Sequence, residues 1–426
     1  MKYICKIITF SAMVWMITGI STCRSIAYKT KTKIHNTIEQ KRIASDLKSA
    51  IKKGDYSKVK ELFNKYDVHK HRSIANTEIR LFQYTCPNID YVQESILYFA
   101  IFCRNKAKEN NKNKYLEIIE FLLENEANPN LPRKRVASSA SRYIDSYPLT
   151  IATRARDVLV VKLLLTHGAN INSLDNPEAD YAQICGSALH IAMSNGDIPI
   201  LEILLAHKGL DINQPIRESW LPLQAGIVSY EFRRDTNQVK AVRLLLRDKR
   251  TDVNKKESFK EKTSLFLAVE CGLIEMVEVL LEHPAIDMEQ KNSYGRTPLV
   301  EAVHGSYVEI VKLLLNRGAN PEGITLTKWG AFLSKLGSAK RKEIQELLAK
   351  AKQNQNKTKA FKYIFDPIDV TKEDGICSIC HTELVDASAH KHAIALKCKH
   401  KFHLDCIAQW VKPSTATCLL CREKIK

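Results

Sequence analysis

The segment Thr297-Pro-Leu-Val-Glu-Ala-Val-His-Gly-Ser-Tyr-Val-Glu-Ile-Val-Lys-Leu-Leu-Leu-Asn-Arg-Gly-Ala-Asn320 decides the architecture that we predict for this chain. Thr297 can cap a helix through its hydroxyl group, and Pro298 suits the first helical turn, where no amide donor is needed. A second apolar stretch ends at Gly318, which can adopt the left-handed conformation that terminates a helix. The segment therefore predicts two short helices. Their inward-facing residues are expected to be Leu299, Ala302, Leu313 and Leu314.

Related strings recur along the chain and indicate internal repeats. They are found at 95–100, 147–152, 187–192, 263–268 and 297–302, with a weaker copy at 221–226. Leu189 to Leu223 and Leu265 to Leu299 are both separated by 34 residues, and longer spacings elsewhere predict inserted loops. One helix pair is an incomplete core, so the pairs are expected to stack on one another.

These strings resemble ankyrin repeats. The resemblance implies a mainly α fold, in which a solenoid of helix pairs binds a protein target whose identity the sequence does not give. We place the array with its capping helices at 44–350, with six repeats between about 90 and 325. Asp46 to Tyr66 is interpreted as a degenerate first repeat. Lys340 to Ala351, which is apolar on one helical face, is interpreted as the terminal cap.

The last fifty or so residues contain thiol and imidazole groups in close pairs. Zn²⁺ prefers four such ligands in a tetrahedron, and short spacers let a chain place two of them on one ion. A segment of this length has little core of its own, so metal binding is expected to drive its folding. The eight candidate ligands are Cys377, Cys380, Cys398, His400, His403, Cys406, Cys418 and Cys421.

This order resembles the RING finger family, in the variety with two central histidines, across residues 374–426. The resemblance implies a small α+β domain with two structural Zn²⁺ ions and interleaved ligand pairs. The first zinc would be bound by Cys377, Cys380, His403 and Cys406. The second zinc would be bound by Cys398, His400, Cys418 and Cys421.

RING fingers act as ubiquitin ligases by binding a ubiquitin-conjugating enzyme that carries ubiquitin on its own cysteine. The resemblance assigns the apolar contact with that partner to Ile379, Trp410 and Leu419, although many relatives have proline where this chain has Leu419. It assigns the bridging contact with ubiquitin to Arg422, whose planar fork of donors suits that role. The chain would supply no catalytic residue of its own. A zinc-stabilised scaffold or adaptor without ligase activity is the alternative.

The formal charge of +18 raises the question of a nucleic-acid partner. The basic residues gather in 24–43 and around 340–362, which flank the array, and no stacking aromatic residues are interleaved with them. We therefore interpret 24–43 as a basic linker and 351–373 as a flexible linker. The lysine-, asparagine- and glutamine-rich stretch Lys350 to Lys359 is interpreted as a tether for the RING finger.

Residues 1–23 have the features of an export signal: Lys2 and Lys6 precede an apolar run that is short for a membrane span. Ile20-Ser-Thr-Cys23 resembles a lipoprotein cleavage site. A lipidated Cys23, an ordinary cleaved signal and a retained membrane anchor all remain open. Because zinc thiolates and the ubiquitin system belong to a reducing cytosol, the combination resembles effectors that intracellular bacteria export into a host cell.

Other potentially reactive residues have simpler interpretations. His190 lies at the start of a predicted helix and is expected to be structural. Cys86, Cys103, Cys185 and Cys271 lack metal-ligand spacing and are expected to be buried thiols.

Overall fold

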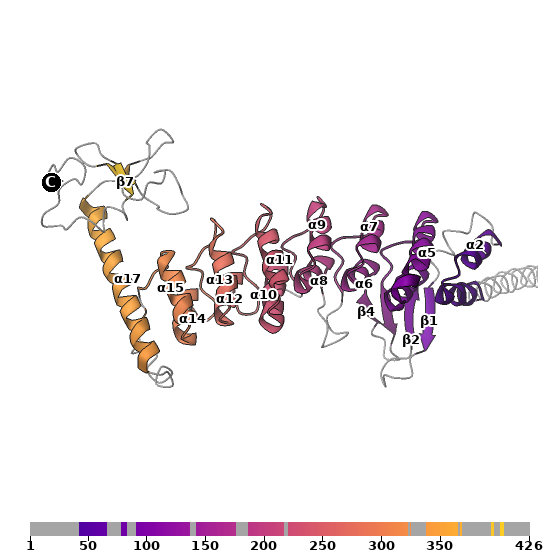
Figure 1. Ribbon diagram of the computed structural model, residues 1–426, viewed down its shortest axis with the longest axis horizontal. Helices are drawn as coiled ribbons and strands as arrows, with labels where there is room; N and C mark the ends of the chain where they lie inside the picture. Colours follow the sequence, from indigo (N-terminus) through magenta and orange to yellow (C-terminus); the bar gives the residue numbers. More distant parts are fainter. Residues whose placement is uncertain are drawn as a thin grey trace, which may run out of the picture. The chain divides into compact units, whose positions relative to one another are not determined.

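The structure is a computed structural model that describes eleven stretches of the chain in two compact units. The first unit runs to Asp211 without residues 193–196, and the second contains 193–196 and the residues from Ile212 onward. Each unit is presented by itself below (Figure 1). The described residues are 42–65, 78–82, 91–136, 142–175, 186–216, 220–322, 324, 338–364, 367–368, 393–395 and 401–403.

The first unit is built from consecutive pairs of short antiparallel helices. A helix at 42–53 pairs with α2 (Tyr56–Lys65), which packs on α5. In the next pairs α4 packs on α6, α5 on α7, and α7 on α9. The bounds of these helices are α4 Ile96–Lys106, α5 Lys112–Glu124, α6 Pro148–Arg154, α7 Val158–Thr166, α8 Ala188–Asn195 and α9 Ile198–Ala206, with a 3-10 turn at Glu109–Asn111.

Polar residues at the helix starts explain where these helices begin. The Ser95 hydroxyl accepts a hydrogen bond from the Tyr98 backbone N–H at 3.1 Å, which caps α4. Asp157 caps α7 by accepting from the Val160 N–H at 3.3 Å. The same carboxylate pairs with the buried Arg104 of α4, with 2.5 Å between Oδ2 and Nε. This ion pair therefore fixes the start of α7 against the preceding repeat.

The first unit also contains an antiparallel sheet with the strand order β1-β2-β3-β4. Its strands are β1 Glu78–Phe82, β2 Tyr91–Ser95, β3 Arg133–Val136 and β4 Arg142–Ser146. The β3–β4 pair occupies the spacing between Leu97 and Leu149, and its register shifts between Arg133 and Lys134. The sequence predicted only inserted loops in this long spacing, and the strands were missed.

The second unit contains three further helix pairs, a long helix and a small sheet. In it α10 packs on α12, α12 on α14, α11 on α13, α13 on α15, and α15 on α17. The helices are α10 Pro222–Arg233, α11 Thr236–Leu246, α12 Ser264–Glu270, α13 Ile274–Leu281, α14 Pro298–Gly305, α15 Val308–Asn316 and α17 Ser338–Ile364. The antiparallel sheet contains β5 Pro367–Ile368, β6 Ala393–Ala395 and β7 Lys401–His403.

Residues 297–320 form α14 and α15 as predicted. Thr297 caps α14 by accepting from the Val300 N–H at 3.4 Å, and Gly318 has a φ of +88°. Leu299 and Leu314 are buried as expected, whereas Leu313 is only half-buried. Within the described residues, six helix pairs lie between Ile96 and Asn316, which confirms the six predicted repeats.

An asparagine side chain links one turn to the next in both units. Asn172 Nδ2 donates to the Gly209 carbonyl at 2.8 Å, and Asn172 Oδ1 accepts from the Asp211 N–H at 2.9 Å. We call these paired contacts the asparagine bridges. Equivalent bridges are made by Asn130, Asn213 and Asn254.

The long helix α17 contradicts the prediction of a flexible tether. The chain is helical from Ser338 to Ile364, which includes Lys350 to Lys359 and most of the predicted linker at 351–373. Lysine, glutamine and alanine are good helix formers, and the stretch contains no glycine or proline. Composition suggested a solvated tether, but the absence of helix-breaking residues allows the terminal cap to continue.

Glu94 is a buried carboxyl group at the end of β2. Its side chain is 3% exposed, its Oε2 lies 3.8 Å from Arg133 Nε, and its Oε1 has no hydrogen-bond partner among the described residues. Burial raises the pKa of Glu94 to about 7, although the positive charges of Arg133 and Lys48 oppose this shift. The carboxyl group is therefore more easily protonated in the folded chain than in the unfolded chain.

We expect Glu94→Gln to stabilise the first unit near pH 8 and to change its stability little near pH 5. The raised folded-state pKa contributes stability below the ordinary pKa near 4.5, and this stability is lost as the pH rises through about 7. A neutral amide avoids that loss, which is on the order of 2–3 kcal/mol. Denaturant unfolding at both pH values measures the difference. Glu120→Gln, at an exposed position of α5, is the control, and a gain independent of pH would contradict the prediction.

Candidate functional site

The small sheet of the second unit carries part of the predicted zinc-binding segment. His403 ends β7 and is paired in register with Ala393 of β6, and Phe402, paired with Ile394, is fully buried. The antiparallel pairing leaves residues 396–400 as the connection between β6 and β7, and this connection contains Cys398 and His400. Three of the predicted ligands therefore belong to one strand and the short connection that precedes it.

Apart from His403, the predicted site residues lie outside the described residues. They are the ligands Cys377, Cys380, Cys398, His400, Cys406, Cys418 and Cys421 and the partner-contact residues Ile379, Trp410, Leu419 and Arg422. The N-terminal signal at 1–23 and residues 24–41 of the predicted linker at 24–43 also lie outside them, whereas residues 42 and 43 begin the first described helix. In the part of the chain that the structure describes, no three histidine, cysteine or acidic side chains converge as a metal site would require. No helix there is long and apolar enough to span a membrane.

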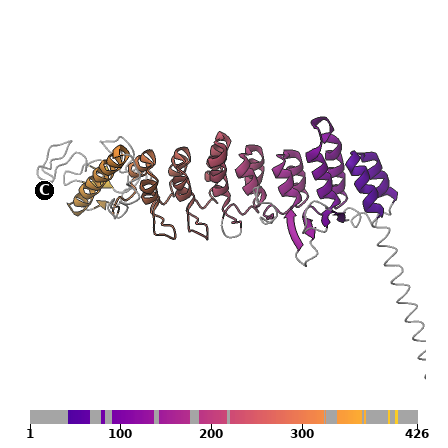
Figure 2. The ribbon, with the colours of Figure 1, turned by 90° about the horizontal axis from the view of Figure 1, so that it is seen from below.

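Three exposed aromatic side chains lie in successive connections of the second unit. Trp220, Phe259 and Tyr294 are 44%, 78% and 68% exposed, and they precede α10, α12 and α14. Figure 2 shows connections of this unit projecting from one side of the helix pairs. Large aromatic rings dominate the energetics of protein interfaces. We call these three residues the aromatic tip row and treat it as the candidate target-binding surface.

The loop that carries Phe259 is held in shape by a single carboxylate. Glu257 accepts hydrogen bonds from the backbone N–H groups of Phe259, Lys260 and Lys262 at 2.6, 2.7 and 3.3 Å. The Ser293 N–H of the next connection donates to the Lys260 carbonyl at 3.0 Å. The exposed ring of Phe259 therefore stands on an ordered loop, which lowers the entropy that binding must cost.

The other two tips have their own local supports. Asn292 Oδ1 accepts from the backbone N–H groups of Tyr294 and Arg296, both at 3.0 Å. Trp220 exchanges backbone hydrogen bonds with Ile216 at 2.8 and 3.3 Å. None of these supports was predicted, because the connections have no periodic pattern in the sequence.

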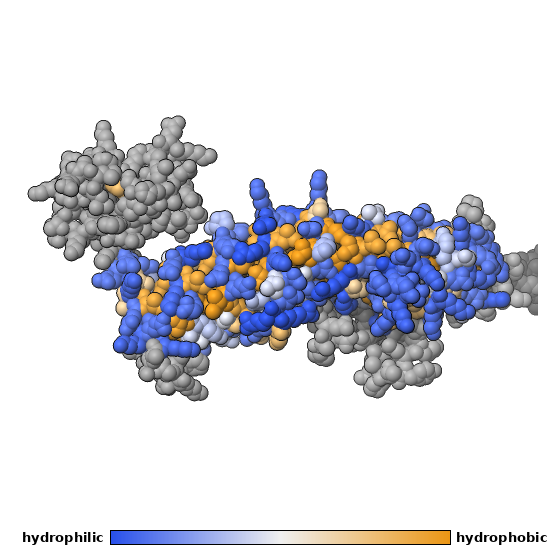
Figure 3. Space-filling view, in the orientation of Figure 1, coloured by the Kyte–Doolittle hydropathy of each residue, from blue (hydrophilic) through white to orange (hydrophobic). Residues whose placement is uncertain are grey.

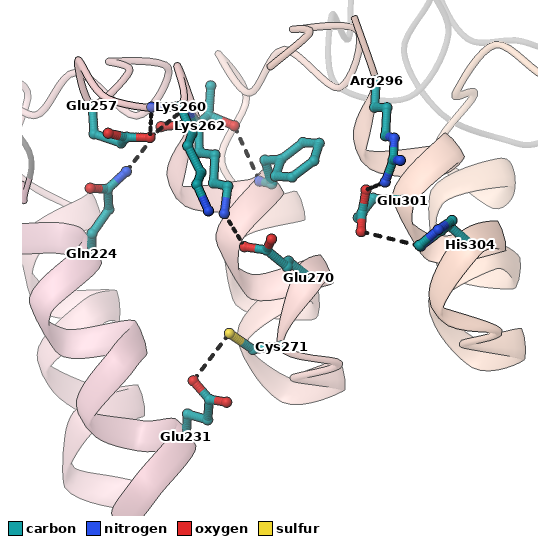
Figure 4. Close-up of polar contacts among 12 residues, drawn as sticks. Gln224, Glu231, Glu257, Lys260, Lys262, Glu270, Cys271, Arg296, Glu301 and His304 are labelled. Carbon is teal, nitrogen blue, oxygen red and sulfur yellow. Dashed lines mark hydrogen bonds and ion pairs between the residues drawn. The ribbon is translucent and has the colours of Figure 1, made fainter. Parts of the chain in front are cut away.

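Polar side chains are paired at both ends of α12: Lys262 lies just before the helix, near the loop of Phe259, and Cys271 lies at the opposite end (Figure 4). Lys262 Nζ lies 2.5 Å from a Glu270 oxygen, and the Cys271 thiol donates to Glu231 at 3.2 Å. Burial, together with this bond to Glu231, raises the pKa of Cys271 to about 12. The thiol is therefore protonated at neutral pH and acts as a hydrogen-bond donor.

A second set of paired charges lies on α14 and the connection before it. Arg296 NH1 is 3.1 Å from Glu301 Oε2, and His304 Nδ1 is 3.7 Å from the other oxygen of Glu301. Because Arg296 and Glu301 carry opposite charges, this pair adds no net charge to the surface. Exposed aromatic rings are therefore a more distinctive feature of this surface than charge.

The second helices of the first unit expose aliphatic side chains. Apolar colour runs over α7 and α9 between charged residues in Figure 3, and Leu159 of α7 is 51% exposed. This strip lacks the aromatic rings that typify binding hot spots. It is therefore a weaker candidate surface than the aromatic tip row.

The structure confirms the structural role predicted for His190. Its ring is fully buried, and its Nδ1 lies 2.8 Å from the Ser187 hydroxyl at the start of α8. Cys103 and Cys271 are partly buried, which corrects the expectation of fully buried thiols. Burial raises the pKa of Cys103 to about 11. Cys86 and Cys185 lie outside the described residues.

Comparison with known families finds two kinds of domain in the chain. A family model described as ankyrin repeats matches residues 107–216 and 233–323. A model described as a Ring finger domain matches residues 375–422, which include all eight predicted zinc ligands. The chain carries ankyrin repeats and a C-terminal RING finger. RING fingers bind zinc, so the C-terminal segment of this ankyrin-repeat RING protein is a zinc-binding domain.

Relatives of each part are found in different proteins. The NF-kappa-B p105 subunit of Gallus gallus is 29% identical over 174 residues, which are 41% of this chain and 16% of that protein. The putative ankyrin repeat protein FPV031 of Fowlpox virus is 26% identical over 202 residues, 46% of this chain and 50% of that protein. The RING-H2 finger protein ATL60 of Arabidopsis thaliana is 41% identical over 54 residues, 12% of this chain and 16% of that protein. The chain thus spans half or less of these relatives.

Proposed function

We propose that this ankyrin-repeat RING protein is a ubiquitin ligase. Its repeats bind a target protein, and its RING finger recruits a ubiquitin-conjugating enzyme charged with ubiquitin. The observation that supports the proposal most strongly is the RING match at 375–422, together with the likeness to a RING-H2 finger protein. The ankyrin repeats support a protein target.

Two Zn²⁺ ions would stabilise the RING finger. Eight thiolate or imidazole donors suffice for two closed tetrahedral sites, and closed sites hold structure without activating water. The donor set fits zinc, and the β6–β7 pairing, with Cys398 and His400 in its connection and His403 at its end, suits a chain that must bring ligands together. In the proposed assignment His403 joins Cys377, Cys380 and Cys406, and the other four residues form the second site.

In ubiquitin transfer, the conjugating enzyme would supply the reactive thioester and this chain would orient it. A lysine amine of the target attacks the thioester carbonyl on the conjugating enzyme, an amide bond forms, and the enzyme's thiolate leaves. Ile379, Trp410 and Leu419 would hold the enzyme by apolar contact. Arg422 would donate hydrogen bonds to both ubiquitin and the enzyme, which holds their flexible linkage in one reactive pose.

The aromatic tip row would receive the target. Its three rings are exposed, so burying them against a partner would remove apolar surface from water. The hydrogen bonds that support the loops of Phe259 and Tyr294 would lower the entropic cost. A non-enzymatic scaffold that binds the same target without modifying it is the alternative function. It shares the tip row but does not need Arg422.

We expect Ile379→Ala and Arg422→Ala each to reduce ubiquitin-chain formation roughly tenfold or more, the first through loss of apolar contact and the second through loss of charge-assisted hydrogen bonds. The assay combines the full chain with activating enzyme, ATP and a panel of conjugating enzymes. Both variants should retain zinc, whereas Cys377→Ala should lose zinc as well as activity. Lys424→Ala is the matched charged control. Wild-type protein that forms no chains with any conjugating enzyme would favour the scaffold.

We expect the triple variant Trp220→Ala, Phe259→Ala, Tyr294→Ala to lose target ubiquitination while free-chain synthesis stays within about twofold, since the tips lie outside the RING finger. Mass spectrometry of ubiquitinated lysines in cells identifies the sites that depend on both the tip row and Arg422. Phe232→Ala is the control, because Phe232 is 79% exposed at the far end of α10. If the triple variant modified the same sites as wild type, target binding by the tip row would be excluded.

We also propose that an intracellular bacterium exports the protein and that it acts in the cytosol of the host cell. The signal-like residues 1–23 support export, and the reduced thiols that a RING finger needs support a cytosolic place of action. Fractionation of infected cells should recover a tagged protein from the host cytosol. Its confinement to the bacterium would contradict the proposal.

A further inference from the structure

The helix α17 is the longest helix among the described residues. It covers 27 residues from Ser338 to Ile364, which corresponds to about 40 Å at the rise of an α-helix. No glycine or proline interrupts it, and Pro367 follows shortly after its end. In Figure 1 it extends beyond the length of the neighbouring α15.

The first half of α17 is fixed to the last repeat. Ile344 and Leu348, one turn apart, are 1% and 4% exposed, so they are buried as α17 packs on α15. Glu343 pairs with Lys312 of α15 at 2.8 Å. Lys352 Nζ donates to the Ile324 carbonyl at 2.9 Å. These contacts span more than two helical turns, so they set the direction of the helix as well as its position.

The second half of α17 leads directly into the RING finger. After Lys352 the helix continues for twelve residues, and only residues 365 and 366 separate it from β5. Pro367 and Ile368 of β5 pair with Ile394 and Ala393 of β6. The strand β6 in turn pairs with β7, which ends at the predicted ligand His403. Two residues span about 7 Å at most, which leaves little slack between the helix and the sheet.

We propose that α17 is a stiff arm that fixes the direction of the RING finger relative to the last repeat and so selects which lysines receive ubiquitin. This inference rests on the proposed ligase function. A flexible tether would let the finger sample many lysines at an effective concentration set by its length. A helical arm confines the RING finger to a small region of space. The rotation about the helix axis at the end of the arm determines where that region lies.

The phase dependence can be tested by insertions after Lys357, beyond the described contacts with the last repeat. Two alanines rotate everything that follows by about 200° and lengthen the arm by about 3 Å. Seven residues, Ala-Lys-Gln-Ala-Ala-Lys-Gln, nearly complete two turns and lengthen it by about 10 Å, so they serve as the phase-matched control. In a third variant, residues 353–364 are replaced by a glycine-serine sequence of the same length.

The first readout is the set of lysines that each full-length variant modifies within its own repeat array. The protein is diluted until transfer no longer depends on its concentration, and the lysines are mapped by mass spectrometry. We expect the two-residue insertion to change which lysines are modified. The seven-residue insertion should keep the modified lysines on the same face of the repeat array, and the glycine-serine variant should modify a larger number of lysines. An identical set in wild type, the two-residue insertion and the glycine-serine variant would overturn the proposal.

Free-chain synthesis separates this outcome from failure of the ligase proposal, because it needs the RING finger but not the arm. If wild type makes no chains, a second readout still decides the arm. Spin labels are introduced through an unnatural amino acid at Glu309 of α15 and Lys401 of β7 in the zinc-loaded full chain. We expect one narrow distance distribution that broadens at least twofold in the glycine-serine variant. Equally broad distributions in both proteins would refute the stiff arm.

Discussion

The asparagine bridges are the contact on which the arrangement of the turns in each unit depends. A turn between repeats has no strand partner, so its backbone groups need another source of hydrogen bonds. The Asn254 amide supplies both kinds: it donates to the Ala285 carbonyl at 2.6 Å and accepts from the Asp287 N–H at 2.9 Å. At the corresponding place in the last repeat, the Glu289 carboxylate accepts from the Asn320 N–H at 2.8 Å, but a carboxylate has no N–H to donate. The final turn therefore receives one such bond instead of two.

The parts of the fold that the sequence predicts are those in which one residue type has one physical role. Leu299 is needed in the core, and Thr297 and Pro298 suit a helix start, so the helix pairs could be predicted. The strand β3, Arg-Lys-Arg-Val, has no apolar alternation that would distinguish it from a charged loop. The end of α17 was missed because lysine and glutamine suit a solvated tether as well as an exposed helix.

The candidate sites also differ in how far the sequence reveals them. Candidate zinc ligands could be named from the sequence because coordination demands particular atoms at short spacings, which a sequence displays directly. The aromatic tip row could not, since the exposure of Phe259 follows from how the Glu257 carboxylate gathers three backbone N–H groups. No periodic pattern marks such a loop, and an aromatic residue in a sequence is more often buried than exposed.

The two described repeat cysteines, Cys103 and Cys271, differ chemically from the cysteines predicted to bind zinc. Burial raises the pKa of Cys103 to about 11 and of Cys271 to about 12, so both thiols stay protonated at neutral pH and react slowly in disulfide exchange. Zinc ligands must instead be thiolates, which are the reactive form until a metal covers them. Oxidising conditions would therefore affect the RING finger first and leave these two repeat thiols largely unchanged. A protein that folds by these two means can lose its zinc-binding domain while its repeats stay folded.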